Sequence, residues 1–131
     1  MKYLLDTHVW LWLATRPERI RPELLAELKH AQTQLLFSAV SSWEIAIKWA
    51  LGRLPLPEPP ATYVPDRIRQ SKAIGLAVEH AHALQVATMP SHHRDPFDRL
   101  LIAQSQLESA PIISSDSAFN AYDVEVINPT A

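Results

Sequence analysis

The sequence predicts an α/β fold. Short runs rich in leucine and β-branched residues alternate with longer stretches of helical periodicity, which is typical of a parallel sheet with crossover helices. A hydrophobic content of 47% and a charged content of 20% are those of an ordinary globular protein. Because 131 residues make about one domain, we expect a single domain over residues 1–131. We expect a central, mostly parallel sheet of about four or five short strands, flanked by helices.

The first part of the chain is expected to form one strand and two helices. Residues 2–5 predict the strand, and residues 7–14 predict a helix that ends before Pro17, because proline restricts the residue that precedes it. Residues 22–31 predict a second helix, with a proline in its first turn. Three leucines fall on one stripe of this helix: Leu24, Leu25 and Leu28.

The next segment predicts a strand, a helix, a loop and another helix. The strand is expected at residues 35–39 and the helix at residues 42–51, closed by Gly52 in a left-handed cap position. Residues 52–60 contain four prolines, each of which removes a backbone donor, so this segment is expected to be a connecting loop. The second helix is expected at residues 61–72.

The remaining part repeats the alternation. A strand at residues 74–76 and a helix at 78–88 precede a polar loop at 89–96. Pro96 fits the first position of a long helix that ends near Ser109, and this leaves Asp95 as the helix N-cap. After Ala110-Pro111 we expect a strand at 112–114, a short helix at 118–121 and a last strand at 124–127.

Composition excludes several kinds of protein. The chain has no cysteine, which excludes disulfides, thiolate metal sites and cysteine nucleophiles and fits a reducing compartment. We therefore expect a cytoplasmic protein. No uncharged apolar run reaches the ~18 residues of a membrane span, and no signal peptide or anchor is expected.

The net charge of −2 argues against binding nucleic acid through bulk electrostatics. The distribution of charge is less uniform, because all twelve lysines and arginines lie at or before Arg99 and the last 32 residues carry four acids and no base. Eleven cations are candidates for phosphate contacts, although each one alone fits a solvated surface position better: Arg16, Arg19, Arg21, Lys29, Lys48, Arg53, Arg67, Arg69, Lys72, Arg94 and Arg99.

Four acids lie at the junctions between the expected elements: Asp6, Glu44, Asp98 and Asp116. The carboxyl ends of parallel strands form the crevice where ligands bind in α/β sheets, so acids that are far apart in sequence can converge there. Converged carboxylates require cations, and oxygen ligands without cysteine suit Mg²⁺ or Mn²⁺, which bridge to phosphates. The junction acids therefore predict metal-dependent phosphodiester chemistry.

Each acid also fits a structural role in capping a helix. Asp6 and Asp116 fit N-caps, and Ser41 with Glu44 fits a capping box. With Asp95 assigned as a cap, Asp98 is left in the first turn of its helix. Caps do not explain why an acid recurs at four junctions flanked by apolar segments, where burying several carboxylates together is costly without a cation.

Four blocks of sequence contain these acids: Leu4-Leu5-Asp6-Thr7-His8, Ser42-Trp43-Glu44-Ile45-Ala46-Ile47-Lys48, His93-Arg94-Asp95-Pro96-Phe97-Asp98-Arg99-Leu100-Leu101-Ile102-Ala103-Gln104 and Ser114-Ser115-Asp116. In their order and approximate spacing they resemble the PIN-domain ribonucleases, specifically the VapC-type toxins of bacterial type II toxin–antitoxin modules. The likeness covers essentially the whole chain, and it implies a PIN-like domain.

The resemblance implies a metal-dependent endoribonuclease. It implies that Asp6, Glu44, Asp98 and Asp116 form an acidic site for Mg²⁺ (or Mn²⁺), in which the metal activates a water for attack on an RNA phosphodiester. Asp6 and Asp98 are the strongest candidates for direct ligands. Supporting or substrate-binding roles are implied for Ser114, Lys48, Thr7 and Asp95. Lys48 also fits an i, i+4 ion pair with Glu44, which we favour over a place in the substrate groove.

Histidines and tryptophans are expected to be structural. Neither His92-His93 nor His80-x-His82 places two imidazoles on one helix face, so a zinc site is rejected and surface positions are expected. His8 is nearer the acids, where we favour a packed or hydrogen-bonding role. Core or interface packing is favoured over base stacking for the four tryptophans, Trp10, Trp12, Trp43 and Trp49.

The resemblance also implies two protein partners. A cognate antitoxin (VapB-type) is expected to occupy the groove, and a homodimer is expected. Two alternative functions stay open: a non-catalytic PIN-like binding module, and a phosphoacceptor receiver domain. The receiver is disfavoured because Asp6-Thr7-His8 has no adjacent pair of acids and the segment after Arg99 has no lysine.

Overall fold

The computed structural model describes residues 1–91 and 95–131, which include five strands. The strands are paired in the order β3-β2-β1-β4-β5, and every pairing is parallel, which confirms the predicted α/β class. Parallel neighbours need crossover connections, and the helices supply them. The strands are β1 (Lys2–Leu5), β2 (Gln34–Ser38), β3 (Ile74–Leu76), β4 (Ile112–Ile113) and β5 (Val126–Ile127).

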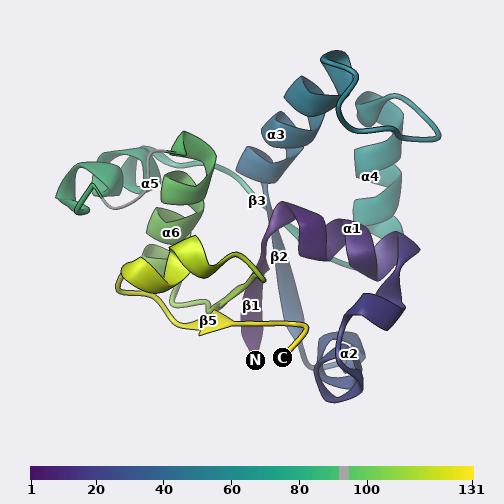
Figure 1. The fold of residues 1–131 in the computed structure, drawn as a ribbon, viewed down its shortest axis with the longest axis horizontal. Coiled ribbons are helices and arrows are strands. Elements are labelled where there is room, and N and C mark those ends of the chain that lie inside the picture. Colours follow the sequence, from purple (N-terminus) through teal and green to yellow (C-terminus); the bar gives the residue numbers. More distant parts are fainter. Residues whose placement is uncertain (92–94) are drawn as a thin grey trace.

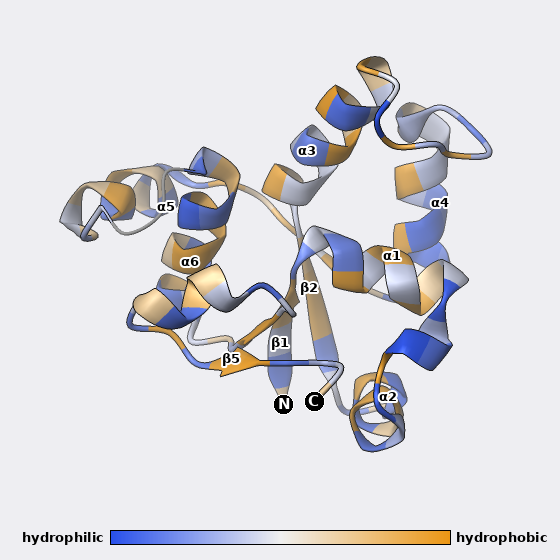
Figure 2. Cartoon of the chain, in the orientation of Figure 1, coloured by the Kyte–Doolittle hydropathy of each residue, from blue (hydrophilic) through white to orange (hydrophobic). Residues whose placement is uncertain are grey.

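Helices cover both faces of the sheet (Figure 1). Helices α1, α2 and α4 lie on one side, α5 and α6 lie on the other, and α3 continues from the end of β2. Helices α3, α4 and α6 show hydrophobic and hydrophilic stripes in Figure 2, as expected of helices with one side on the core. The helices are α1 (Thr7–Thr15), α2 (Pro22–Lys29), α3 (Ala39–Ala50), α4 (Pro60–Ser71), α5 (His80–Gln85) and α6 (Pro96–Glu108), with 3-10 turns η1 (Pro17–Arg19), η2 (Val86–Thr88) and η3 (Ser117–Ala121).

Two hydrophobic clusters lie on the two faces of the sheet. Because successive strand side chains point to opposite faces, Leu5 joins the cluster under α1 while Leu4 joins the cluster under α6. In the first cluster Trp10 stacks on Phe37 with 3.9 Å between ring centroids. This packing fixes the start of α1 against the end of β2, next to the carboxyl ends of the strands.

Helix α3 starts earlier than the sequence predicts. The hydroxyl of Ser38 accepts the backbone N–H of Val40 at 3.0 Å, so Ser38 is the N-cap and the helix begins at Ala39 instead of residue 42. The expected capping box of Ser41 and Glu44 is therefore wrong, because Ser41 lies inside the helix and is buried.

The helix expected at residues 78–88 is shorter than predicted, and one of its histidines is not at the surface. Helix α5 ends at Gln85 and continues as η2. His82 is only 2% exposed, because its ring packs between the N-terminus of α5 and the Glu108 carboxylate of α6. The surface prediction was wrong for His82, whereas His80 is exposed. The predictions for His92, His93 and Arg94 lie outside the described residues.

The last strand is also shorter than predicted, with two residues instead of four. Val124 and Glu125 precede it, and the carbonyl of Glu125 accepts the N–H of Ile112 at 2.9 Å. Within the described part of the chain, none of the helices has the length and apolar character needed to cross a membrane.

Candidate active site

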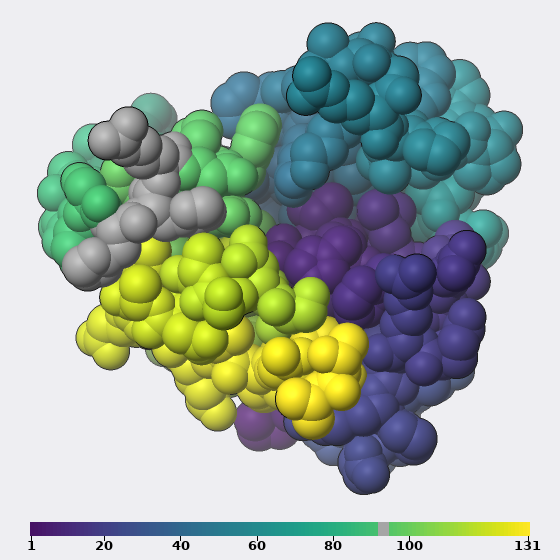
Figure 3. Space-filling view, in the orientation of Figure 1, coloured from purple at the N-terminus to yellow at the C-terminus, as the bar shows by residue number. Residues whose placement is uncertain are grey.

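All four junction acids line one cleft of ≈ 360 Å³. Asp6 follows β1, Glu44 lies in α3, Asp98 lies in the first turn of α6, and Asp116 is the N-cap of η3. Figure 3 shows a purple surface, near the start of the chain, recessed between the teal and green parts and the yellow-green C-terminal part. The structure therefore brings together residues that are up to 110 positions apart, as the parallel topology predicts.

Asp6 is held by bonds from two neighbouring elements. One carboxylate oxygen accepts the N–H of Thr7 at 2.8 Å, which makes Asp6 the predicted N-cap of α1. The other oxygen accepts the Ser114 hydroxyl at 2.7 Å. The pairing of β1 with β4 places these residues side by side, since the N–H of Asp6 donates to the carbonyl of Ile113 at 3.1 Å.

The Asp6 carboxylate is unusually well shielded from solvent for an ionisable group. It is 5% exposed, and burial raises its pKa above the ordinary aspartate value. His8, whose Nδ1 lies 3.3 Å from Oδ2, and the bonds from Ser114 and Thr7 act in the opposite direction and offset only part of the shift. An ionised Asp6 would gain from a further cation in the cleft.

Glu44 is fixed by one contact on each carboxylate oxygen. The Thr7 hydroxyl donates to Oε1 at 2.7 Å, and its oxygen also lies 2.8 Å from the Ser41 hydroxyl. The Lys48 ammonium donates to Oε2 at 2.6 Å, which confirms the predicted i, i+4 pair. The hydrogen bond that Lys48 donates to Glu44 raises the pKa of Lys48, and the charges of Asp95 and Asp98 add to this effect.

Asp95 and Asp116 each cap a helix or 3-10 turn and also line the cleft. Asp95 accepts the N–H of Phe97 at 2.9 Å and the N–H of Asp98 at 3.4 Å, so it caps α6 as predicted while it also lines the cleft. Asp116 accepts the N–H of Ala118 at 2.9 Å. Its own N–H donates to the Ser114 hydroxyl at 3.0 Å, so Ser114 connects two of the acids.

The composition of the cleft suits a hard divalent cation. Among the described residues, its lining contributes five carboxylates and two permanent cations, Lys48 and Arg53. Carboxylate oxygens are the ligands that Mg²⁺ and Mn²⁺ prefer. In residues 1–91 and 95–131, however, no three Asp, Glu or His side chains are grouped as they would be around one ion. Ion pairs with Lys48 and His8 engage Glu44 and Asp6, so binding a metal requires side-chain movement.

Sequence reasoning underrated two residues of the cleft. His8 contacts Ser115, with Nε2 2.9 Å from the hydroxyl, and its ring packs edge-on against Trp12. These contacts confirm the packed, hydrogen-bonding role favoured for it. Arg53 was one of eleven candidate cations, and the structure places it in the lining of the cleft, directly after the helix-closing Gly52.

The tryptophans have different environments. Trp10 is buried in the core, in agreement with the core packing favoured for it. Trp43 is 55% exposed and meets Phe97 edge-on at 4.8 Å between centroids, and Trp49 is also exposed. These two side chains of α3 are therefore surface groups near the cleft wall.

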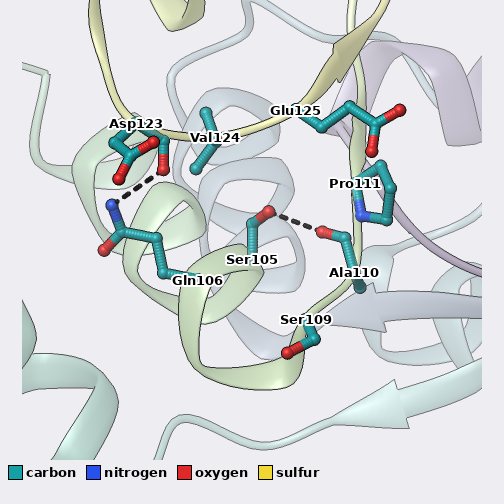
Figure 4. A pocket seen from close by; sticks show the side chains of 8 residues that line it. All are labelled: Ser105, Gln106, Ser109, Ala110, Pro111, Asp123, Val124 and Glu125. Carbon is teal, nitrogen blue, oxygen red and sulfur yellow. Dashed lines mark hydrogen bonds between the residues drawn. The ribbon is translucent and has the colours of Figure 1, made fainter.

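A second hollow, of ≈ 260 Å³, lies between the end of α6 and the segment before β5 (Figure 4). None of the four junction acids lines it. Two hydrogen bonds join residues that line it, since the Ser105 hydroxyl donates to the carbonyl of Ala110 and the Gln106 amide donates to the carbonyl of Asp123. This hollow therefore has the features of a structural junction and not of a reactive site.

Known proteins resemble the chain in sequence and in fold. Ribonuclease VapC16 of Mycobacterium tuberculosis is 50% identical over 60 residues, which is 46% of this chain and 43% of that protein, so the match spans less than half of that relative. Ribonuclease VapC22 of the same organism is 26% identical over 119 residues, 91% of this chain and 90% of that one. The crystal structure of VapBC2 from Rickettsia felis, bound to a DNA fragment from their promoter, superposes with a TM-score of 0.73 at 12% identity over 98% of both chains. The PIN domain model matches residues 3–125, and the chain therefore belongs to the PIN domain family.

Proposed function

We propose that this chain is a metal-dependent endoribonuclease and the toxin of a toxin–antitoxin module. The observation that carries the proposal is the single cleft that Asp6, Glu44, Asp98 and Asp116 all line. Family membership and the two relatives named as ribonucleases support it. The excess of carboxylates over cations suits hydrolysis of a phosphodiester with the help of a divalent metal.

In this proposal Asp6 and Asp98 are the direct ligands of Mg²⁺ or Mn²⁺. When bound, the ion lowers the pKa of a coordinated water and stabilises charge on the phosphate. Ser114 and the N–H of Thr7 hold both oxygens of Asp6, which fixes the direction in which the carboxylate faces. Glu44 and Asp116 serve as further ligands or orient the attacking water.

We also propose two protein contacts. The solved structures with this fold include VapBC2 and other toxin–antitoxin complexes, which supports a cognate antitoxin as partner. Helix α3 exposes two tryptophans, Trp43 and Trp49, and Leu51 follows its end, which supports a protein-binding or homodimer surface there. An antitoxin arginine among the carboxylates would imitate the cation. Undiminished cleavage after the purified partner is added would contradict this mode of inhibition.

Cleavage of total bacterial RNA by the purified protein tests the proposal. The reactions contain Mn²⁺, Mg²⁺ or EDTA, and the cut ends are mapped. Asp98→Asn removes a cleft carboxylate, and Asp123→Asn is the matched control because Asp123 is an exposed acid outside the cleft. We expect discrete, metal-dependent cuts that only Asp98→Asn loses. Equal cutting by both variants would contradict the mechanism, and no cutting by any form would favour a non-catalytic binding module.

A further inference from the structure

We propose that Arg53 binds a backbone phosphate of single-stranded RNA beside the acidic cleft. The inference rests on the proposed ribonuclease function and adds a substrate-binding residue to it. Arg53 lines the same cleft as the four junction acids, on the α3 side. An RNA whose scissile phosphate lies at the carboxylates must continue past one of the walls, and among the described lining residues the α3 side carries the lysine and the arginine.

The backbone around Arg53 is held in one conformation. Gly52 adopts φ +72°, a left-handed value that closes α3. The N–H of Gly52 donates to the carbonyl of Trp49 at 3.0 Å, and the N–H of Arg53 donates to the carbonyl of Lys48 at 2.8 Å. Leu54 packs against the hydrophobic core directly afterwards. Arg53 is thus fixed between a helix cap and a core residue, at the edge of the cleft.

Charge distinguishes Arg53 from the neighbouring Lys48. Lys48 already donates to Glu44 at 2.6 Å, so its charge is balanced within the protein. In contrast, the Arg53 side chain makes no ion pair or hydrogen bond with any residue in the described ranges. A guanidinium presents a planar fork of donors that matches a phosphate, which makes Arg53 the better phosphate ligand.

Three other arginines are engaged elsewhere. Arg19 lies over the Trp12 ring and Arg67 over the Tyr63 ring, with their guanidinium carbons 5.5 and 5.2 Å from the ring centroids. Arg69 pairs with Asp66 on α4. None of these three lines the cleft. Of the candidate cations in residues 1–91 and 95–131, Arg53 is the one that both location and charge select.

Binding and cleavage measured in parallel test the inference. Binding is measured with a fluorescein-labelled single-stranded oligoribonucleotide. The protein is the full chain carrying Asp98→Asn, which is expected to prevent cleavage. To this background we add Arg53→Gln, Arg53→Lys or Arg16→Gln. Arg16 is exposed at the far end of α1 and serves as the matched control. Cleavage uses the same Arg53 and Arg16 substitutions in the otherwise unchanged protein, with melting temperatures recorded for all.

We expect Arg53→Gln to weaken RNA binding about tenfold, and to reduce the slope of log K against log salt by about 0.7, the value for one phosphate contact on a single strand. Its KM should rise with kcat unchanged, because a phosphate contact binds substrate and transition state equally. Arg53→Lys should retain part of the affinity, and Arg16→Gln all of it.

Unchanged KM and unchanged salt slope in Arg53→Gln would overturn the inference, and a lowered melting temperature alone would assign Arg53 a structural role at the end of α3. If the unsubstituted protein cuts RNA and Arg53→Gln cuts it equally well, only this inference fails. If no form cuts RNA but binding still depends on Arg53, the nuclease proposal fails and the phosphate contact stands.

Discussion

The cleft at the strand ends and the contact between α5 and α6 both bury ionisable side chains, but they satisfy them differently. Beside α6, His82 accepts the N–H of Glu79 at 2.9 Å on Nδ1 and faces the Glu108 carboxylate at 3.1 Å on Nε2. Gln104 extends this network to the carbonyl of Ala77 and the hydroxyl of Ser38. In the cleft, by contrast, Asp6 is buried near further carboxylates, which outnumber the cations among the lining residues that the structure describes.

Burial of ionisable side chains in the α5–α6 contact therefore has a structural role, whereas burial of Asp6 in the cleft fits a functional one. A network whose donors and acceptors match is stable without any ligand, and it holds two helices together. A buried set of like charges is unfavourable unless a cation joins it. The carboxylates of the cleft therefore still repel one another until a cation binds, whereas the α5–α6 network needs no ligand. The predictions below test the two regions separately.

The largest expected effect is on catalysis. Asp6→Asn should lower the initial rate of RNA cleavage by at least about 100-fold, because metal assistance is worth several kcal/mol in the transition state. Rates are compared at saturating Mn²⁺ with those of Asp123→Asn. A rate for Asp6→Asn within twofold of the control would show that the cleft carboxylate is not part of the machinery.

The structural network should respond in stability and not in turnover. His82→Ala should lower the free energy of unfolding by about 2–3 kcal/mol, because it removes a buried ring and its bonds to the Glu79 N–H and the Glu108 carboxylate. Urea denaturation measures the effect, with His80→Ala as the exposed control. Loss of kcat in molecules that remain folded would contradict the separation between the two regions.

A smaller effect is expected at the turn that carries Arg53. Gly52→Ala should cost about 1–2 kcal/mol, because a side chain disfavours the left-handed conformation at φ +72°. Gly75→Ala in β3 is the matched control, since a Cβ there meets no atom within 4 Å and its backbone is not left-handed. Equal unfolding free energies for the two variants would show that the turn is not strained by the change.

The smallest effect is a dependence of stability on pH. Burial raises the folded-state pKa of Asp6, so the folded protein binds a proton more tightly than the unfolded chain does. Without metal, the unsubstituted protein should therefore lose stability relative to Asp6→Asn as pH rises from below the ordinary aspartate value of about 3.9 through the raised one. Urea titrations at pH 3, 5 and 7 measure the difference. A gain in stability of the unsubstituted protein relative to Asp6→Asn between pH 3 and pH 7 would contradict the assigned direction.

Local features of the fold could be predicted from sequence. Pro96 fixes the start of α6 and leaves Asp95 as its cap, and Gly52 ends α3, because backbone constraints act within a few residues. The choice between Ser38 and Ser41 as the cap of α3 could not be predicted. Both serines fit a cap locally, and the pairing of Ser38 with Leu76 in β3 is what keeps Ser38 at the strand end.

In the site, too, some features could be predicted from the sequence and others could not. Junction acids could be recognised, since their positions follow from the alternation of strands and helices. The burial of His82 could not, because its partner Glu108 lies 26 positions away on another helix. Nor could Arg53 be chosen among eleven cations, because which of them faces the cleft depends on how the turn after α3 is placed in space.

The measurement that tests the central claim most directly is the shift of melting temperature with Mn²⁺. A ligand that binds only the folded protein stabilises it in proportion to RT ln(1 + [L]/Kd). If the cleft carboxylates hold a cation, Mn²⁺ should raise the melting temperature of the unsubstituted protein and of Asp123→Asn, and leave that of Asp98→Asn unchanged. Equal shifts in all three proteins, or no shift in any of them, would contradict the claim.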